Sequence, residues 1–388
     1  MNHFRDLLLS LLVAMVALSS CRKEEEIIPS SRVRVGVPGR PGKIKGFFLL
    51  NEANMGSNKA TLDYYDYTTA FYTRNIYAER NPNVVKELGD VGNDLQIHGS
   101  RLYAVINVSG LIEVMDVRTA KHIGKLSIPN CRYIAFKDGF AYVSSYAGPV
   151  KIDPNARLGY VAKVDTATLK VVAECPVGYQ PEELLIQGDK LYVANSGGYR
   201  APNYDETISI IDLKTFTEEK QVDVAINLHR LQLDNYGKIW ASSRGDYKGV
   251  PSRLFVFDPK TERVTKTLEV GCSNMALSGD SLFVYSSEWS YLTGKNTISY
   301  TVIDTKKQEV IDRNFIKDGT DKEIQLPYGL AINSEQGELY LTDAQDYVHP
   351  GQLHCYDLKT GRRKWSVKTG DIPAHIAFTT QPLQPLHH

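Results

Sequence analysis

The sequence predicts an all-β fold: a single seven-bladed β-propeller, in which four-stranded antiparallel blades form a ring that the C-terminal strand closes. Three observations lead to this fold. Seven strand-like segments end in Asp, seven others carry an aromatic residue near their start, and one more strand-like segment follows the last unit. The units repeat every 46–53 residues, a length typical of propeller blades.

The first observation is a strand that ends in Asp and runs into a turn, mostly of the form D-x-x-T. It recurs every 46–53 residues, and only the sixth copy lacks the Thr, with Lys307 in its place; the seven positions are Asp66, Asp116, Asp165, Asp212, Asp258, Asp304 and Asp357. An Asp at this point can accept hydrogen bonds from the backbone N–H groups of the turn. We therefore expect these carboxylates to fix turns and not to act as catalytic acids or bases.

The second observation concerns the strand before each Asp strand. Its aromatic residues are Phe48, Tyr103, Tyr142, Tyr192, Trp240, Phe283 and Tyr340. Most units carry one further apolar segment before this strand and one after the turn, which gives four short strands. Such strands bury both faces when blades pack around an axis, and few edges stay open. A pair of two-sheet β-sandwiches is the alternative, but it does not explain seven matched units.

The third observation is at the two ends of the repeats. The first unit enters at Gly46 without an inner strand, and Pro373–Phe378 has the pattern of an inner strand with no strands after it. We expect this last segment to complete the first blade and close the ring.

The N-terminus has the features of a targeting segment. Arg5 precedes the apolar run Leu7–Leu18, which is too short to span a bilayer and ends in "LSSC" at Cys21. This resembles the bacterial lipobox, in which the Cys is lipidated; a plain secretory signal with an incidental Cys is the alternative. The "RKEEE" that follows resembles the surface-export signal of Bacteroidetes lipoproteins, or is a solvated charge run. Lipidation would make the lipid anchor the only membrane contact.

The predicted organisation is a signal peptide at 1–20, a lipidated Cys with a flexible tether at 21–45, the propeller at 46–379 and a tail at 380–388. The tether is rich in Pro, Gly, Ser, Arg and Lys and has no apolar period. The net charge of +0 gives no electrostatic reason for a nucleic-acid partner. The Cys spacings match no metal pattern, and Cys175 and Cys355 are expected to be small core residues.

Candidate binding residues lie in the loops between the second and third strands and in the connections between units. A propeller brings both to one face, around the mouth of its channel. The candidates combine aromatic area with directional hydrogen bonds. They are Tyr133, Tyr146, Tyr179, Tyr199, Arg200, Asn203, Tyr204, His229, Arg230, Arg244, Tyr247, Trp289, Tyr291, Tyr328, Tyr347 and His375. For any single Tyr, the alternative is a ring wedged between blades.

The catalytic motifs that we searched for are absent: G-x-S-x-G, H-E-x-x-H, the P-loop and G-x-G-x-x-G. We therefore expect a protein that is not an enzyme and has no cofactor. Glu52, Asn107, Asn195 and Asn274 could converge near the axis, as in calcium-dependent propeller lactonases, but no spacing requires it. His229 and His375 are interpreted as hydrogen-bonding wall residues, and no metal is expected.

Segments of the sequence resemble the repeat of a known family. "KLYVANSGG" with "ISIIDLKT", and "ECPVGYQPEELLI", resemble the YncE-like (YVTN-type) propeller repeat, over nearly all of Gly46–Phe378. With the lipoprotein signal and the aromatic face, the chain resembles the BtuG-type cobalamin-capture lipoproteins of gut Bacteroidetes. The resemblance implies an outer-membrane, cell-surface location, a corrinoid (vitamin B12) ligand and hand-off to a TonB-dependent transporter. A surface glycan- or protein-binding propeller, or a calcium-dependent lactonase or hydrolase, are the alternatives.

Overall fold

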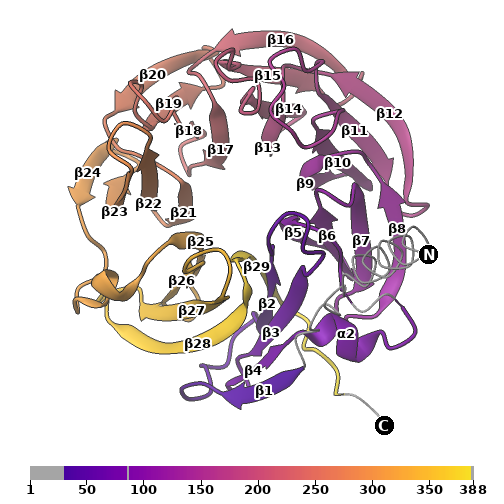
Figure 1. Ribbon diagram of the computed structural model, residues 1–388, viewed down its shortest axis with the longest axis vertical. Coiled ribbons are helices and arrows are strands. Elements are labelled where there is room, and N and C mark those ends of the chain that lie inside the picture. The colour runs from indigo at the N-terminus through magenta and orange to yellow at the C-terminus, as the bar shows by residue number, and fades with distance from the viewer. Residues whose placement is uncertain (1–29, 85–86, 386–388) are drawn as a thin grey trace, which may run out of the picture.

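The described residues form a ring of seven antiparallel sheets around a central channel (Figure 1). The computed structural model describes residues 30–84 and 87–385, with the backbone alone at 290 and 295. Six sheets have four strands and one has five, so the predicted seven-bladed β-propeller is confirmed. Helix is limited, in these residues, to α2 (Ile76–Arg80) and η1 (Thr320–Glu323).

The strands of each blade are given from the channel outward. Blade 1 contains β29 (Pro373–Thr379), β2 (Gly46–Asn51), β3 (Thr61–Asp66), β4 (Phe71–Arg74) and β1 (Ser31–Arg34). Blade 2 contains β5 (Gly92–His98), β6 (Arg101–Ile106), β7 (Leu111–Asp116) and β8 (His122–Ser127). Blade 3 contains β9 (Cys131–Lys137), β10 (Phe140–Ser145), β11 (Tyr160–Asp165) and β12 (Lys170–Pro176). Blade 4 contains β13 (Pro181–Gln187), β14 (Lys190–Asn195), β15 (Thr207–Asp212) and β16 (Thr217–Asp223).

The remaining blades follow the same order. Blade 5 contains β17 (Leu228–Leu233), β18 (Ile239–Ser243), β19 (Arg253–Asp258) and β20 (Arg263–Leu268). Blade 6 contains β21 (Asn274–Ser278), β22 (Ser281–Ser290), β23 (Lys295–Asp304) and β24 (Glu309–Asp312). Blade 7 contains β25 (Pro327–Asn333), β26 (Glu338–Asp343), β27 (Pro350–Asp357) and β28 (Arg363–Asp371).

Blade 1 contains both the first and the last strand of the described chain. β29 pairs with β2 from His375 opposite Leu50 to Thr379 opposite Gly46, so the C-terminal segment closes the ring as predicted. At the outer edge β1 pairs with β4, with Ser31 opposite Arg74. The ordered domain therefore begins before the predicted boundary at Gly46. An edge strand needs only the unpaired backbone groups of its neighbour, so a polar segment without apolar period can join the sheet.

The signal peptide and Cys21 lie outside the described residues. The described part of the predicted tail, 380–385, lies against the propeller, where Leu383 packs on the core between blades 1 and 2. The Leu383 N–H also donates to the Tyr64 hydroxyl (3.2 Å). In the described ranges, no helix is long and apolar enough to cross a membrane.

The repeated Asp residues fix turns, as predicted. Asp165 accepts hydrogen bonds from the backbone N–H (2.7 Å) and the hydroxyl (2.9 Å) of Thr168. In the sixth unit, Asp304 accepts the N–H of Lys307 (2.9 Å), whose ammonium nitrogen lies 3.9 Å from the carboxylate. Lysine has no hydroxyl near the backbone, so this turn lacks the second hydrogen bond.

The core lies between neighbouring blades, and the repeated aromatic residues are buried in it. Trp240 of blade 5 is fully buried and packs with Leu282 and Ile303 of blade 6. Its indole N–H donates to Asp234 (2.9 Å), which satisfies the polar edge of the ring. Cys175 and Cys355 are buried core residues with free thiols, as predicted.

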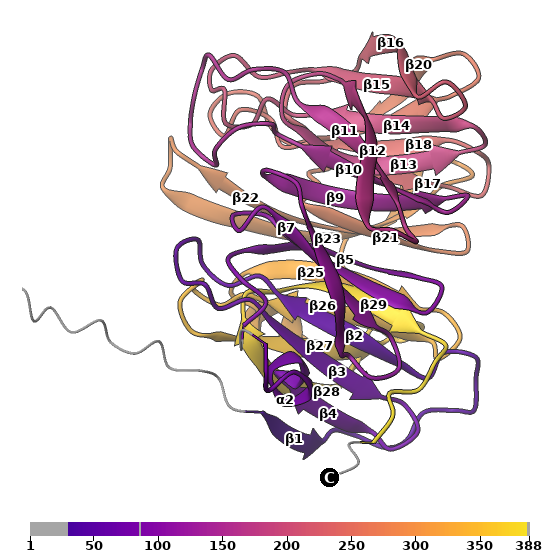
Figure 2. The same ribbon diagram turned by 90° about the vertical axis from the view of Figure 1, so that its right-hand side faces the viewer.

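One face of the ring carries the loops that join the second and third strands of each blade. We call it the mouth face; its loops are 52–60, 107–110, 146–159, 196–206, 244–252, 291–294 and 344–349. The hairpin of β22 and β23 has ten residues in each strand, longer than the other second and third strands, and extends beyond its neighbours on this side (Figure 2). The connections between blades end on the same face.

Candidate functional site

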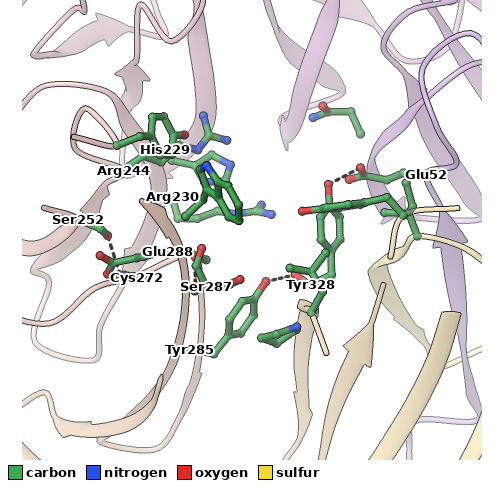
Figure 3. A pocket seen from close by; sticks show the side chains of 18 of the residues that line it. Glu52, His229, Arg230, Arg244, Ser252, Cys272, Tyr285, Ser287, Glu288 and Tyr328 are labelled. Carbon is green, nitrogen blue, oxygen red and sulfur yellow. Dashed lines mark hydrogen bonds between the residues drawn. The ribbon is translucent and has the colours of Figure 1, made fainter. Parts of the chain in front are cut away.

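A cavity of about 720 Å³ opens on the mouth face at the centre of the ring. Loops and inner strands of several blades supply its lining, part of which Figure 3 shows. Nine predicted site residues line it: Tyr133, Tyr199, His229, Arg230, Arg244, Tyr247, Trp289, Tyr328 and Tyr347. The volume lies within the range of small-molecule sites, about 300–1,000 Å³.

A repeated β-bulge positions several of these side chains. In blade 5, Leu228 pairs with Ser243 and Leu231 with Ala241, so His229 and Arg230 together oppose the single residue Ser242. The inner strands of blades 3, 4 and 7 have the same two-against-one arrangement, at 132–133, 182–183 and 328–329. A bulge leaves the extra residue unpaired and re-aims side chains. It thereby brings a pair of residues from each of these four blades to the mouth of the channel.

Side chains of the second strand support the bulges. The Ser242 hydroxyl accepts a hydrogen bond from the Arg230 N–H (3.0 Å), and Ser144 does the same for the Tyr133 N–H (3.1 Å). In addition, Asn130 and Asn227 enter the inner strands of blades 3 and 5 with positive φ angles of 45° and 54°. Asn tolerates this left-handed conformation better than most residues. Small hydroxyl residues and Asn at these positions therefore fix where the bulged side chains point.

Behind the lining, two arginines that line the cavity hold a buried carboxylate, Glu182. Arg132 approaches Glu182 with Nε and Nη2 at 3.0 Å, and Arg244 Nη1 lies 3.1 Å away. The Tyr146 hydroxyl donates to the same carboxylate (2.5 Å). Burial alone would raise the pKa of Glu182, but Arg132 and Arg244 outweigh it and lower the pKa, so the group is ionised.

A second cluster, which contains Tyr133, His229, Arg230 and Glu183, adjoins the cluster around Glu182. The Tyr133 hydroxyl and His229 Nε2 are 2.9 Å apart, and the Arg230 guanidinium lies 5.1 Å from the centre of the Tyr133 ring. Burial, reinforced by the charges of Arg244 and Arg230, lowers the pKa of His229 well below its usual range, so its imidazole is neutral. Burial raises the pKa of Glu183 to about 7, although Arg230, with Nη1 at 3.7 Å, acts in the opposite direction.

The opposite wall carries Glu52, between two donors. The Tyr328 hydroxyl donates to Oε2 (2.7 Å) and His375 Nε2 lies 2.9 Å from Oε1. Burial and the neighbouring Glu52 raise the pKa of Tyr328, so its hydroxyl stays protonated and remains a donor. Figure 3 shows Glu52 and Tyr328 across the cavity from Arg230, Arg244 and His229. One wall of the cavity therefore carries two arginines and a histidine, and the opposite wall carries a carboxylate and a tyrosine.

Aromatic rings form the rim of the cavity. Trp289 and Tyr347 are 46% and 43% exposed, although both line the cavity. Tyr247 packs edge-on against Tyr291, which is 68% exposed at the tip of the β22–β23 hairpin. Large exposed rings beside a concave site are typical of ligand-binding surfaces.

The other predicted site residues lie around the cavity and not in its lining. Tyr146 and His375 are behind it, hydrogen-bonded to Glu182 and Glu52. The Arg200 guanidinium stacks on Tyr179, 3.5 Å from the ring centre, and also donates to the Asn203 carbonyl. The loop that carries Arg200, Asn203 and Tyr204 thus contributes Tyr199 to the lining, while the others pack on the loop itself or face solvent.

Two of the possible calcium ligands, Asn195 and Asn107, are engaged in hydrogen bonds. Asn195 bonds to Thr207 (2.9 Å) and Ser209 (2.8 Å) within blade 4, and Asn107 bonds to Asn130 (2.5 Å) and the Cys131 carbonyl. Over residues 30–84 and 87–385, no three His, Cys, Asp or Glu side chains are grouped to hold a metal ion.

Glu182 and Glu183 were not among the predicted residues, although they contact Arg244 and Arg230 of the lining. They follow Pro181 at the start of an inner strand, as His229 and Arg230 follow Leu228. Aligning the inner strands of the units with each other would have marked the pair as equivalent to Arg132 and Tyr133. Without the bulge, alternation along the strand would send one of the two away from the channel.

These features define a β-propeller with a preorganised polar and aromatic cavity at the mouth of its channel. The chain belongs to the family described as "Domain of unknown function (DUF5074)", whose model matches residues 45–379. No curated protein is similar enough in sequence to be matched.

Two solved structures share the fold at low sequence identity. Hydrazine synthase of Kuenenia stuttgartiensis is 18% identical with a TM-score of 0.54, over 69% of this chain and 77% of that one. The Pan2 WD40 domain of Neurospora crassa is 13% identical with a TM-score of 0.50, over 75% of this chain and 80% of that one. At such identities the likeness concerns the fold alone, since one fold hosts many functions.

Proposed function

We propose that this protein is a cell-surface lipoprotein that binds a corrinoid and passes it to an outer-membrane TonB-dependent transporter. The observation that carries the proposal is the cavity, whose wide mouth combines exposed aromatic rings with fixed hydrogen-bonding groups. A corrinoid is a broad, rigid ring edged by amides. Rings such as Trp289 can stack on it, while Glu52 can accept hydrogen bonds from its amide groups and the Tyr247 hydroxyl can donate to their carbonyls.

Preorganisation supports tight binding. Arg132, Arg244 and Tyr146 are held by Glu182, and Tyr328 and His375 by Glu52. Side chains that are already fixed lose little conformational freedom when a rigid ligand binds, and so more of the contact energy appears as affinity.

The direction of β1 supports delivery toward a membrane. Ser31 pairs with Arg74, at the end of β4 that leads into the connection to blade 2, so β1 begins on the mouth face. Nine residues lie between Cys21 and Ser31, so ten Cα–Cα steps separate the two. An extended chain of this length spans at most about 35 Å. A lipid on Cys21 would therefore keep the mouth-face edge of blade 1 near the membrane, where a transporter lies.

The test is calorimetry of the propeller with cyanocobalamin and dicyanocobinamide, without added metal. We expect nanomolar or tighter binding, weakened by Trp289→Ala and unchanged by Trp365→Phe, which alters a ring between blades 1 and 7 away from the cavity. Absence of heat and of co-elution with either corrinoid would refute the proposal.

A surface glycan is the second candidate ligand, because the exposed rings of Trp289, Tyr291 and Tyr347 would also suit sugar faces. Binding to a glycan array, with no response to corrinoids, would favour this function. A calcium-dependent hydrolase is less favoured, because both oxygens of Glu52 already accept hydrogen bonds from Tyr328 and His375. Lactone hydrolysis that a chelator abolishes would favour it.

A further inference from the structure

The arginines at the base of the cavity are unevenly matched with carboxylates. Arg132 and Arg244 share the single carboxylate of Glu182. Arg230 has Glu183 at 3.7 Å and also feels the charge of Asp94. Asp94 is itself fixed, since its carboxylate accepts the N–H groups of Leu95 (2.8 Å) and Ile134 (3.0 Å). The Arg132–Arg244 pair, with one carboxylate for two guanidinium groups, therefore carries surplus positive charge.

Donor groups near this surplus charge are unused. In the part of the chain that the structure describes, His229 Nδ1 and Arg230 Nε are buried without a hydrogen-bond partner. When Nε2 accepts the hydrogen bond of the Tyr133 hydroxyl, the neutral imidazole carries its proton on Nδ1, which is then a donor. Arg244 contacts Glu182 through Nη1, and 25% of its side chain is exposed, into the cavity that it lines. Unpaired buried donors and an unbalanced charge are costly, and both are relieved when an acceptor with negative charge is bound.

The other carboxylates of the lining have partners of their own. Glu52 accepts hydrogen bonds from Tyr328 and His375, and Glu288 accepts one from the Ser286 hydroxyl (2.7 Å). Among the described residues, the carboxylate that forms an ion pair with Arg244 is Glu182, and neither Glu52 nor Glu288 does so. Arg244 thus has donor capacity left for a ligand.

We propose that Arg244, with the neighbouring imidazole of His229, forms an oxyanion subsite at the base of the cavity that takes a phosphodiester of the ligand. Guanidinium groups suit phosphate oxygens because two N–H groups can donate in parallel. This rests on the proposed function, since the nucleotide loop of a cobalamin carries a phosphodiester. Dicyanocobinamide, which lacks that loop, carries none.

The test compares cyanocobalamin with dicyanocobinamide on the wild type, Arg244→Met, Arg244→Lys and Lys151→Met. Lys151 is an exposed lysine in a mouth-face loop outside the lining and controls for net charge. We expect Arg244→Met to weaken the binding of cyanocobalamin about 10- to 100-fold and the binding of dicyanocobinamide less than about twofold. Arg244→Lys should recover part of the loss, and Lys151→Met should change neither affinity.

Equal weakening of both corrinoids, or no weakening of either, would overturn the subsite. Retained folding of each variant is checked by its thermal unfolding midpoint. If the wild type binds neither corrinoid, the proposed function is refuted. The oxyanion subsite is then tested separately with phenyl phosphate. Phenyl phosphate should raise the unfolding midpoint of the wild type and not of Arg244→Met; a wild type that does not respond would overturn the subsite as well.

Discussion

The hydroxyl of Tyr328 donates a hydrogen bond to the carboxylate of Glu52 across 2.7 Å, and so joins the inner strand of blade 7 to the loop that follows β2 in blade 1. The two residues are 276 positions apart in the sequence. His375, on the closing strand, approaches the other oxygen of the same carboxylate. The place where the ring closes is therefore also a wall of the cavity.

Replacing Tyr328 with Phe should reduce the free energy of unfolding by about 1–2 kcal/mol, because Glu52 loses one of its two donors. Urea unfolding measures this. Tyr300→Phe is the matched control, since among the described residues the Tyr300 hydroxyl is buried without a partner. Its removal should cost little, and an equal loss in both variants would contradict the role given to the hydrogen bond.

Tyr199→Ala should weaken ligand binding at least about tenfold, because aromatic residues of a lining contribute most of the contact area. Asn203→Ala, four residues further along the same loop, should leave the affinity within about twofold, since Asn203 is exposed and outside the lining. Titrating both variants with the same ligand and comparing their affinities tests this prediction. A larger loss for Asn203→Ala would place the site on the outer part of the loop.

Lys307→Thr should stabilise the propeller by about 0.5–1 kcal/mol. A Thr hydroxyl at this position can donate to Asp304, as that of Thr168 does to Asp165. The variant gives up an ammonium–carboxylate contact of 3.9 Å, which is exposed and weak. The denaturation midpoint should rise with an unchanged denaturant slope; a fall would show that the sixth turn has a different geometry.

Glu183 should make stability depend on pH. Its pKa is raised from 4.5 to about 7 in the folded protein, so between these values the folded state holds a proton that the unfolded chain has released. The stability of the wild type therefore falls as pH rises through this window, by at most about 3 kcal/mol.

Glu183→Gln removes this titration and can still accept the Leu231 N–H bond, which Glu183 receives at 2.8 Å. The stability of the variant relative to the wild type should thus increase between about pH 5 and about pH 8. Urea unfolding at several pH values measures the difference. A difference that stays constant with pH would show that Glu183 is ionised throughout.

Deleting 373–388 should open the ring, because β2 loses its inner partner strand. We expect the free energy of unfolding to fall by more than about 5 kcal/mol, which is comparable with the total stability of many domains. Deleting 381–388 alone keeps β29 and removes the Leu383 contact, so it should cost far less. Circular dichroism during thermal unfolding would compare the two, and similar midpoints would mean that closure contributes little.

The features that recur in every unit could be predicted from the sequence. The Asp turns, the buried aromatic residues and the closing strand depend on local patterns, so each copy supports the others. The strand β1 could not be predicted, because Ser31–Arg34 has a single apolar residue, Val33, and pairs with a strand that is distant in the sequence. The contact of the Arg32 guanidinium with the Phe71 ring (4.1 Å) likewise depends on this pairing.

Much of the site depends on geometry that no single segment encodes. Glu182 and Glu183 belong to a strand with an ordinary apolar pattern, and only the bulge brings both to the channel. Tyr179 and Arg200 have the composition of binding residues, but they stack on each other beside the cavity. Composition pointed to the face on which the cavity opens, whereas the lining of the cavity depends on loop conformation and on the neighbouring blade.

The pairing of β29 with β2 has a consequence for how the protein is made. The first blade to leave the ribosome has to wait for the last residues of the repeat before it receives its inner strand. A chain that ends early, through a premature stop or a proteolytic cut, keeps the edge of β2 open and lacks His375 beside Glu52. Synthesis of β29, ring closure and assembly of the cavity wall are thus coupled, and only chains that include β29 acquire the finished site.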